Sequence, residues 1–181
     1  MRKSENEFRR MSIMGPVTDA TERQSTFVVT HVDDATVVLR DVHTAQVHPV
    51  SSAHELSINE LTRGDVLEAT LRAEPPLDVS WQLIDVTERR TIDLIDSDLE
   101  PTTRSKATGA DLGVGELSRI ERAGTGEIHV LRVSDDRVEE TVQDILEDEE
   151  TIARAARLAA VRVEVRCTST DGIVSVRYLP D

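Results

Sequence analysis

The chain has 181 residues, of which 38% are hydrophobic and only 2% aromatic, and its formal net charge at pH 7 is -14. This length is enough for one ordinary domain or two small ones, with cores built from aliphatic side chains. The charge disfavours adhesion to nucleic acid or to anionic membranes through bulk electrostatics. No apolar run approaches the ~18 residues of a membrane-spanning helix, and the single Cys167 excludes an internal disulfide.

The composition also predicts the environment of the protein. Lys3 and Lys106 are the only lysines among 21 basic residues, in a chain that is acidic and poor in aromatic residues. These features are typical of a halophilic protein, because in molar salt the Debye length falls to ~3 Å and crowded carboxylates barely repel one another. The lone cysteine favours a reducing cytoplasm. Residues 1–24 have no apolar stretch behind their charges, so they predict a disordered leader instead of a secretory signal, with Met1, Met11 and Met14 as alternative starts.

Residues 25–95 predict a β-rich domain. "TFVVTHV" and "ATVVLRDV" flank a turn at Asp33-Asp34 and predict a hairpin, and "AQVHPV" adds a third strand. A short helix or ordered loop follows in "SSAHELSINELTRGD". "VLEATLRA" alternates as a fourth strand, with Leu67, Ala69 and Leu71 on one face. "LDVSWQLIDV" alternates as a fifth strand and continues into "RRTIDLI" past a bend at Glu88. This order is that of a small barrel similar to the OB and TRAM folds, with an open β-sheet as the alternative.

Residues 96–126 predict a linker. Five of the eight glycines lie in this segment, with Pro101 and a run of Thr, Ser and Asp, and "GELSRIERA" suggests one short helix within it. The remaining residues, 127–181, predict a second domain with the order β-α-β-β. The expected fold class is therefore α+β, with a linker between two domains.

The second domain begins with the strand "EIHVLRV". Asp135 or Asp136 is placed to cap a helix with Val138, Val142, Ile145 and Leu146 at helical spacing. "EETIARAARLAA" is either a second helix or a kinked continuation of the first. "VRVEVRCT" and "IVSVRYLP" then form a hairpin, which predicts a three-stranded sheet with the helices on one face.

Residues 134–150 carry nine carboxylates and one arginine. A calcium loop requires a glycine in a fixed Asp/Asn pattern, and this stretch has no glycine. The acids recur around an apolar helical stripe, so we expect them to spread over the solvated face of the helix.

No catalytic, cofactor-binding or metal-binding motif emerges. His31, His43, His48 and His54 lie close in sequence, but their spacing matches no known zinc site, so they are expected to be ordinary strand and loop residues. Cys167 alternates with valines on an apolar strand face and predicts a buried thiol instead of a nucleophile. We therefore expect no enzyme activity.

One candidate interaction surface follows from strand alternation. The apolar residues of the last three strands point to one face of the sheet, which leaves the other face rich in arginine. The arginines assigned to this face are Arg132, Arg162, Arg166 and Arg177. Arginine suits bidentate contact with carboxylate or phosphate, so this face is expected to bind a partner. The alternative is that the face packs within the chain, on the linker or on the first domain.

Four stretches together resemble an uncharacterised protein family of haloarchaea. They are "TFVVTHVDDATVVLRDVHTAQVHPV", "LEATLRAEPPLDVSWQLIDVTERRTI", "GELSRIERAGTGEIHVLRV" and the pair "VRVEVR" and "DGIVSVRYLP", spanning residues 25–180. The family is a domain of unknown function, so the resemblance implies a halophilic cytoplasmic protein and no activity, cofactor or catalytic residue.

Three functions are compatible with the sequence. The first is a non-catalytic binding or adaptor module that docks on a protein or a ribonucleoprotein. The second is a single-stranded RNA-binding protein that uses the barrel, although Phe27 and Trp81 alone offer rings for stacking and both alternate with aliphatic residues as core positions do. The third is a small metalloprotein or hydrolase with a histidine site. The sequence does not indicate an oligomeric state.

Overall fold

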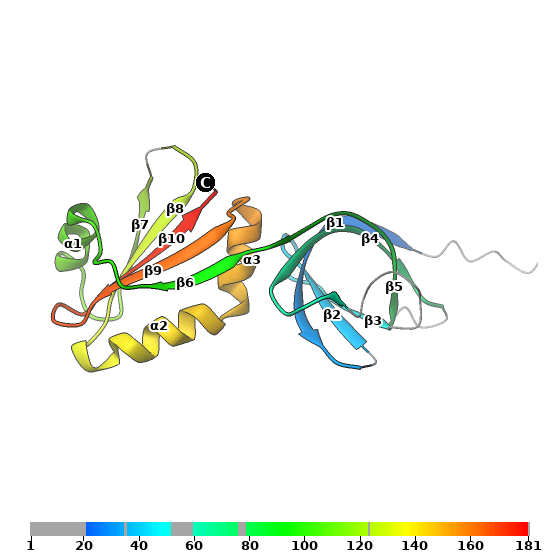
Figure 1. The fold of residues 1–181 in the computed structure, drawn as a ribbon, viewed down its shortest axis with the longest axis horizontal. Coiled ribbons are helices and arrows are strands. Elements are labelled where there is room, and N and C mark those ends of the chain that lie inside the picture. The colour runs from blue at the N-terminus through cyan, green and yellow to red at the C-terminus, as the bar shows by residue number, and fades with distance from the viewer. Residues whose placement is uncertain (1–20, 35, 52–59, 76–78, 123, 181) are drawn as a thin grey trace, which may run out of the picture.

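A computed structural model describes residues 21–34, 36–51, 60–75, 79–122 and 124–180. Within these residues the chain forms two five-stranded β-sheets and three α-helices, so the protein is of the α+β class (Figure 1). The first sheet precedes the three helices in the chain, and the second sheet is formed by the segments around them.

The first sheet contains the strands that alternation predicts. β1 and β2 form the expected hairpin, and β1 also pairs with β4, so the strand order is β1-β2-β3-β5-β4. β3 and β5 meet in parallel at one residue pair, Val50 and Trp81. The strands are β1 (Glu22–Val32), β2 (Thr36–Asp41), β3 (Val47–Ser51), β4 (Asp65–Ala73) and β5 (Trp81–Thr91). Most of the predicted helix or loop after β3 lies outside the described residues.

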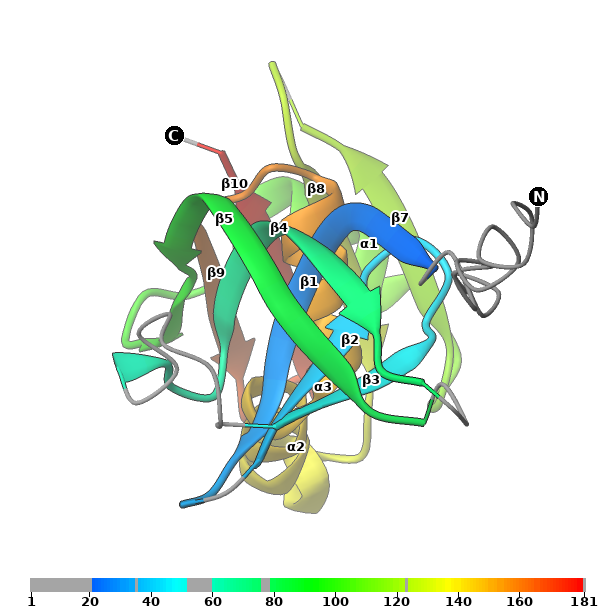
Figure 2. The same ribbon diagram turned by 90° about the vertical axis from the view of Figure 1, so that its right-hand side faces the viewer.

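Figure 2 shows the curved strands of the first sheet, and their inward-facing side chains form an aliphatic core. Phe27, Leu39, Leu67 and Leu71 are fully buried, and the expected inward face of β4 is confirmed. The ring of His48 is also buried and meets the rings of Phe27 and Trp81 edge-on. Burial of the apolar side chains stabilises the sheet by roughly 1.5–3 kcal/mol for each large residue.

The second sheet has the order β6-β9-β10-β8-β7. β6 runs parallel to β9, and the other neighbours are antiparallel. The elements are β6 (Asp93–Ser97), α1 (Thr103–Ala110), β7 (Leu117–Glu121), β8 (Glu127–Arg132), α2 (Val138–Glu147), α3 (Glu149–Arg157), β9 (Arg162–Thr168) and β10 (Ile173–Leu179).

The segment 96–126 is not the linker that the sequence predicts. It contains α1 and β7, and together with β6 it adds two strands to the expected three. The "GELSRIERA" stretch is mainly a strand instead of a helix. The glycine content was misleading because two of the five glycines serve close packing. A Cβ on Gly109, inside α1, would lie 2.9 Å from side-chain atoms of Ile173, and one on Gly126 would lie 2.3 Å from the carbonyl oxygen of Tyr178.

The acidic stretch forms two helices instead of one kinked helix. The helical conformation is interrupted at Asp148, which has extended backbone angles. Its side chain accepts a hydrogen bond from the backbone N–H of Glu150. Asp135 and Asp136 lie in a short 3₁₀ turn before α2 and do not cap it, contrary to the prediction. All the carboxylates of the stretch except Glu149 are exposed, so the predicted solvated face is confirmed.

The helices lie on both faces of the second sheet, whereas one face was predicted. α2 and α3 cover the apolar face, where Val142 and Ile152 share a core with Val165 and Val176. α1 covers part of the opposite face, above β8 and β10. Its contact there is tight because Ser105 and Gly109 are the buried residues of the helix.

The two sheets are packed together through α3, which lies between them in Figure 1. Val28 and Val66 of the first sheet belong to the same apolar cluster as Ile152 and Ala156 of α3. The guanidinium of Arg157 donates to the carbonyl oxygen of Val42 at 2.8 Å. Residues of both sheets therefore share one apolar cluster, which is separate from the interior core of the first sheet.

Candidate anion-binding surface

The strand register defines which side chains share the face opposite α2 and α3. Residues paired across neighbouring strands point to the same side of a sheet. One such row runs from β6 to β8 through Ile95, Glu164, Arg177 and Ile128. The row therefore places Arg177 in the middle of the sheet, with an apolar side chain near each end.

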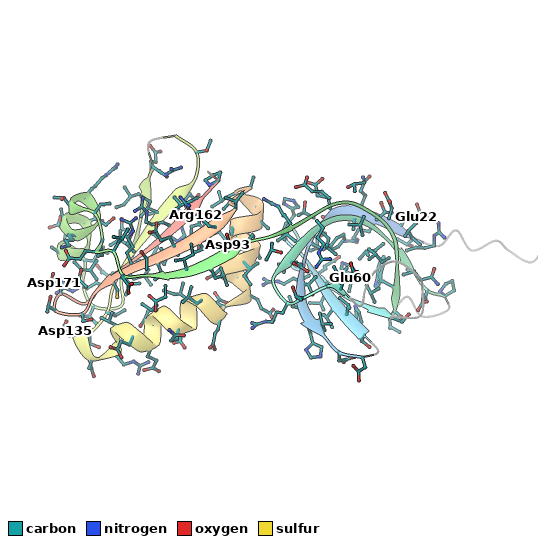
Figure 3. All side chains as sticks on the ribbon, in the orientation of Figure 1. Glu22, Glu60, Asp93, Asp135, Arg162 and Asp171 are labelled. Atoms are coloured by element: carbon teal, nitrogen blue, oxygen red, sulfur yellow. The ribbon has the colours of Figure 1, made fainter. Side chains whose placement is uncertain are left out.

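The neighbouring rows add two more of the predicted arginines. Arg166 lies opposite Ser175 in the row on one side, and Arg162 lies opposite Asp93 and Leu179 in the row on the other. Figure 3 labels Arg162 and Asp93 on these adjacent strands. The geometry thus brings three of the four predicted arginines together.

Arg132 lies apart from this group. It is paired with Ile173, whereas Arg177 is paired with Ile128, so four residues of β8 separate the two arginines along the strands. At about 3.4 Å per residue this is about 14 Å. The half of the face near Ile173 is covered by α1, where Ser175 and Ser105 are buried against each other. This half of the face therefore packs within the chain, as the alternative prediction proposed. The covering helix, α1, lies in the segment that was expected to be a linker.

Arg122 joins the group from a segment that sequence reasoning assigned to the linker. It follows β7 and donates through its guanidinium to the carbonyl oxygen of Thr125 at 2.7 Å. Its charge acts on Arg177, as do the charges of Arg162 and Arg166. We call Arg122, Arg162, Arg166 and Arg177 the arginine surface.

Glu164 is the carboxylate at the centre of the arginine surface. Its Oε1 atom accepts a hydrogen bond from Nε of Arg166 at 2.9 Å and another from Oγ of Ser97 at 3.1 Å. Burial opposes ionisation of Glu164, but these hydrogen bonds and the nearby guanidinium charges outweigh it and lower the pKa. Glu164 is therefore ionised at neutral pH and is already held by Arg166.

Arg177 interacts only weakly with the carboxylate of Glu164. Its Nε atom lies 3.9 Å from Oε2 of Glu164, beyond hydrogen-bond distance, and only 16% of its side chain is exposed. Nε is buried and has no hydrogen-bond partner among the described residues. Burial, followed by the positive charge of Arg166, lowers the pKa of Arg177, although Glu164 opposes the shift. An arginine still keeps its proton at neutral pH, so Arg177 carries an under-neutralised charge.

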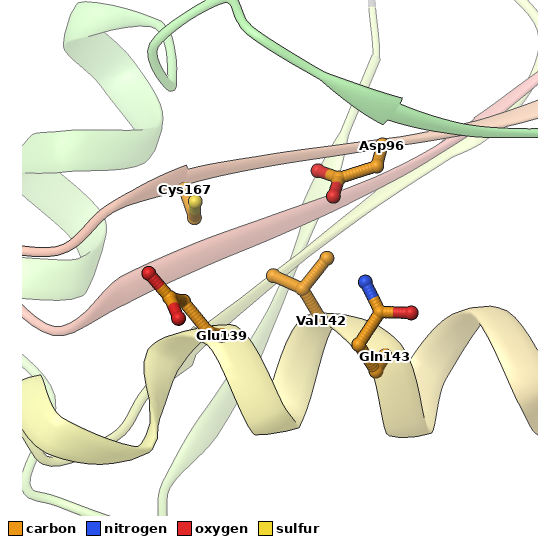
Figure 4. Close-up of a pocket in the computed structure, with 5 residues that line it drawn as sticks. All are labelled: Asp96, Glu139, Val142, Gln143 and Cys167. Carbon is orange, nitrogen blue, oxygen red and sulfur yellow. The ribbon is translucent and has the colours of Figure 1, made fainter.

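Two other features, a pocket and the histidines, offer different chemistry. A pocket of about 320 Å³ between α2 and the sheet is lined by Asp96, Glu139, Val142, Gln143 and Cys167 (Figure 4). Burial and the charges of Asp96 and Glu139 raise the pKa of the Cys167 thiol, so at neutral pH it stays protonated and is a poor nucleophile. The prediction of an inert thiol agrees with this direction, although Cys167 is only partly buried.

The histidines that the structure describes do not converge on one site. His48 is inside the core of the first sheet, His31 is exposed beside Asp33, and His54 lies outside the described residues. Among the residues that the structure describes, no group of three His, Cys, Asp or Glu side chains is arranged to hold a metal ion. Phe27 is buried and Trp81 packs against His48, so both rings belong to the core, as their alternation predicts.

The fold and this surface define an α+β protein with two packed sheets and an arginine-rich sheet face. Residues 23–167 match the family described as "Family of unknown function (DUF5812)", so the chain belongs to that family. No curated protein and no solved structure matches the chain. None of the helices in the described part of the chain is long and apolar enough to cross a membrane.

Proposed function

We propose that this protein is a non-catalytic binding or adaptor module that docks on a protein partner through the arginine surface. The observation that carries the proposal is Arg177, a largely buried guanidinium with an unpartnered Nε among the described residues. A buried charge without a full partner costs free energy. Such a residue is expected where binding, instead of folding, supplies the missing anion.

The surroundings of Arg177 support a protein partner. Ile95 is 38% exposed in the same row of the sheet, which gives the surface an apolar contact beside its charges. Interfaces between proteins typically combine arginine with apolar side chains. A long polyanion such as RNA would bring many phosphates against a chain of net charge -14, which disfavours the ribonucleoprotein and RNA alternatives.

The proposal also includes the type of barrel that the first sheet forms and the environment in which the protein works. The pairing of β1 with both β2 and β4 supports a small barrel of the OB or TRAM kind for the first sheet. The acidic, lysine-poor composition supports a halophilic cytoplasmic protein of haloarchaeal origin. In this account the first sheet is a scaffold, and the second sheet carries the binding surface.

Site-specific photo-crosslinking tests the proposal. A photoreactive residue at Ile95 is expected to capture a discrete protein in cells of the host, and Arg162→Glu is expected to abolish that adduct. Arg162 is exposed, so the charge reversal leaves the core intact. The matched control is Val47, an exposed valine of the first sheet, where a photoreactive residue should not capture the same protein.

Three results would contradict the proposal. The adduct at Ile95 could persist unchanged in Arg162→Glu, or the same protein could be captured equally well at Val47. Recovery of nucleic acid at Ile95 in place of protein would favour the RNA alternative.

A further inference from the structure

We infer that the arginine surface recognises a single carboxylate in an extended acidic segment of the partner, and that Glu164 competes for the same guanidinium groups. The inference rests on the proposed function and adds the chemistry of the recognised group. It follows from the order of side chains in one row of the sheet.

The charge on the surface is positive at the point where a ligand would bind. Three other guanidinium groups gather around that of Arg177, and the carboxylates on the same rows are Glu164 and Asp93. Glu164 uses one oxygen for Arg166 and Ser97 and leaves its other oxygen 3.9 Å from Arg177. An incoming carboxylate therefore supplies the close negative charge that the guanidinium of Arg177 lacks among the described residues.

A carboxylate fits this position better than a phosphate dianion. The ligand has to approach within a few ångströms of the ionised Glu164, and the repulsion grows with the charge of the ligand. A carboxylate carries one negative charge, and its planar pair of oxygens matches the side-on fork of a guanidinium. The buried surroundings strengthen the attraction because less water screens it.

The apolar neighbours indicate what lies beside the carboxylate. Ile95 is two strands from Arg177 on one side, and Ile128 is one strand away on the other. Neighbouring strands are about 4.8 Å apart, so the apolar groups lie about 10 Å and 5 Å from the charge. In an extended peptide, side chains at positions i and i+2 point the same way about 7 Å apart. An extended peptide that has a glutamate with leucines two residues before and after it can therefore place its carboxylate near Arg177 and its apolar side chains near Ile95 and Ile128.

Glu164 acts as an internal competitor in this arrangement. It occupies Arg166 and repels the incoming carboxylate while it remains ionised. Replacing it with glutamine keeps a hydrogen-bond acceptor for Arg166 and Ser97 but removes the negative charge. The affinity for the acidic segment should then rise by about threefold or more, as expected for removing one like charge at a distance of several ångströms near a protein surface.

The experiment follows the arginine Nε–H signals by NMR in the full-length protein at the lowest KCl concentration that keeps it folded. The probe is the peptide acetyl-Leu-Ser-Glu-Ser-Leu-amide, and the control peptide has glutamine in place of glutamate. The glutamate peptide should shift the Arg177 signal and leave that of Arg72, which is paired with Glu22 on the first sheet, unchanged. The Glu164→Gln variant should bind the same peptide more tightly.

The inference is overturned if the glutamate and glutamine peptides shift Arg177 equally or not at all in the wild-type chain, whose fold is not in question. It is also overturned if inorganic phosphate shifts Arg177 and the peptide does not, or if Glu164→Gln, folded by its NMR spectrum, binds no more tightly. When the crosslink at Ile95 depends on Arg162 but the peptide has no effect, only this inference fails. When that crosslink also fails, the proposed function fails with it.

Discussion

Nε of Arg177 lies 3.9 Å from Oε2 of Glu164, while Nη2 of Arg166 contacts the other oxygen of the same carboxylate at 2.8 Å. Two arginines therefore share one glutamate, and the nearer one holds it. Arg177 therefore differs from arginines that stabilise the fold by holding a carboxylate within hydrogen-bond distance. Arg89, for example, donates to the fully buried carboxylate of Asp65 at 2.8 Å.

The shared apolar cluster predicts that the two sheets unfold together. Trp81 is in the first sheet, whereas α2 and α3 cover the second, so tryptophan fluorescence and helical circular dichroism report on different parts of the chain. Because Val28 and Val66 pack with residues of α3, denaturant titrations followed by the two signals should give the same midpoint. Separate midpoints would mean that the sheets are independent domains.

The sequence predicted the strands of the first sheet well and the segment 96–126 poorly. Strand alternation is a local signal, so residues such as Leu67 and Leu71 were placed correctly on the inward face. Glycine content is an ambiguous signal. Gly109 is required for close packing on Ile173, a contact between residues far apart in sequence that no local pattern reveals.

The same distinction applies to the candidate site. Alternation placed Arg162, Arg166 and Arg177 on one face, which the strand register supports. Packing of this face on the linker was the alternative, but alternation did not show that a helix, α1, would form there and cover only the half near Arg132. The contribution of Arg122 and the unequal sharing of Glu164 depend on distances that only the folded chain defines.

Gly109→Ala should destabilise the protein. An added Cβ would meet Ile173 side-chain atoms at 2.9 Å, and Ile173 is itself buried, so overpacking should cost about 1–3 kcal/mol. The better helix propensity of alanine offsets about 1 kcal/mol of this cost. Gly113→Ala is the matched control, because its nearest neighbour is the end of the Glu116 side chain at 3.4 Å. Equal free energies of unfolding for the two variants would contradict the packing of α1.

The stability of the protein should fall as the pH is lowered from 7 to 5. Burial lowers the pKa of His48, helped by the charge of Arg23 and opposed by Asp41. The unfolded chain then binds a proton near pH 6.5 that the folded chain binds only at lower pH, so stability is retained above pH 6.5 and lost below it. The slope is at most about 1.4 kcal/mol per pH unit for one histidine.

His48→Phe should reduce this slope, because phenylalanine does not titrate and can pack between Phe27 and Trp81. Denaturant unfolding at pH 5, 6, 7 and 8 measures the difference. His129 shifts in the same direction, since burial lowers its pKa against the hydrogen bond to Glu127, so some slope should remain. An unchanged slope in His48→Phe would show that His48 does not contribute.

Salt should stabilise the fold. The net charge is -14, and most carboxylates of residues 134–150 are exposed around α2 and the start of α3, where repulsion grows as screening is withdrawn. The melting temperature should therefore rise between about 0.1 M and 3 M KCl, a range over which the Debye length falls from ~10 to ~2 Å. A melting temperature that does not change with salt would contradict the halophilic assignment.

The central claim is that Arg177 is retained for binding and not for folding, and the unfolding free energy of Arg177→Met tests it most directly. Glu164 keeps its contacts with Arg166 and Ser97 in this variant, so no buried charge is left unpaired. Methionine should fill the space of the guanidinium and leave the stability unchanged or higher by about 1 kcal/mol. The matched control, Arg89→Met, removes a partner from buried Asp65 and should cost about 2 kcal/mol. A loss in Arg177→Met as large as that in Arg89→Met would show that Arg177 is a structural residue and would contradict the account.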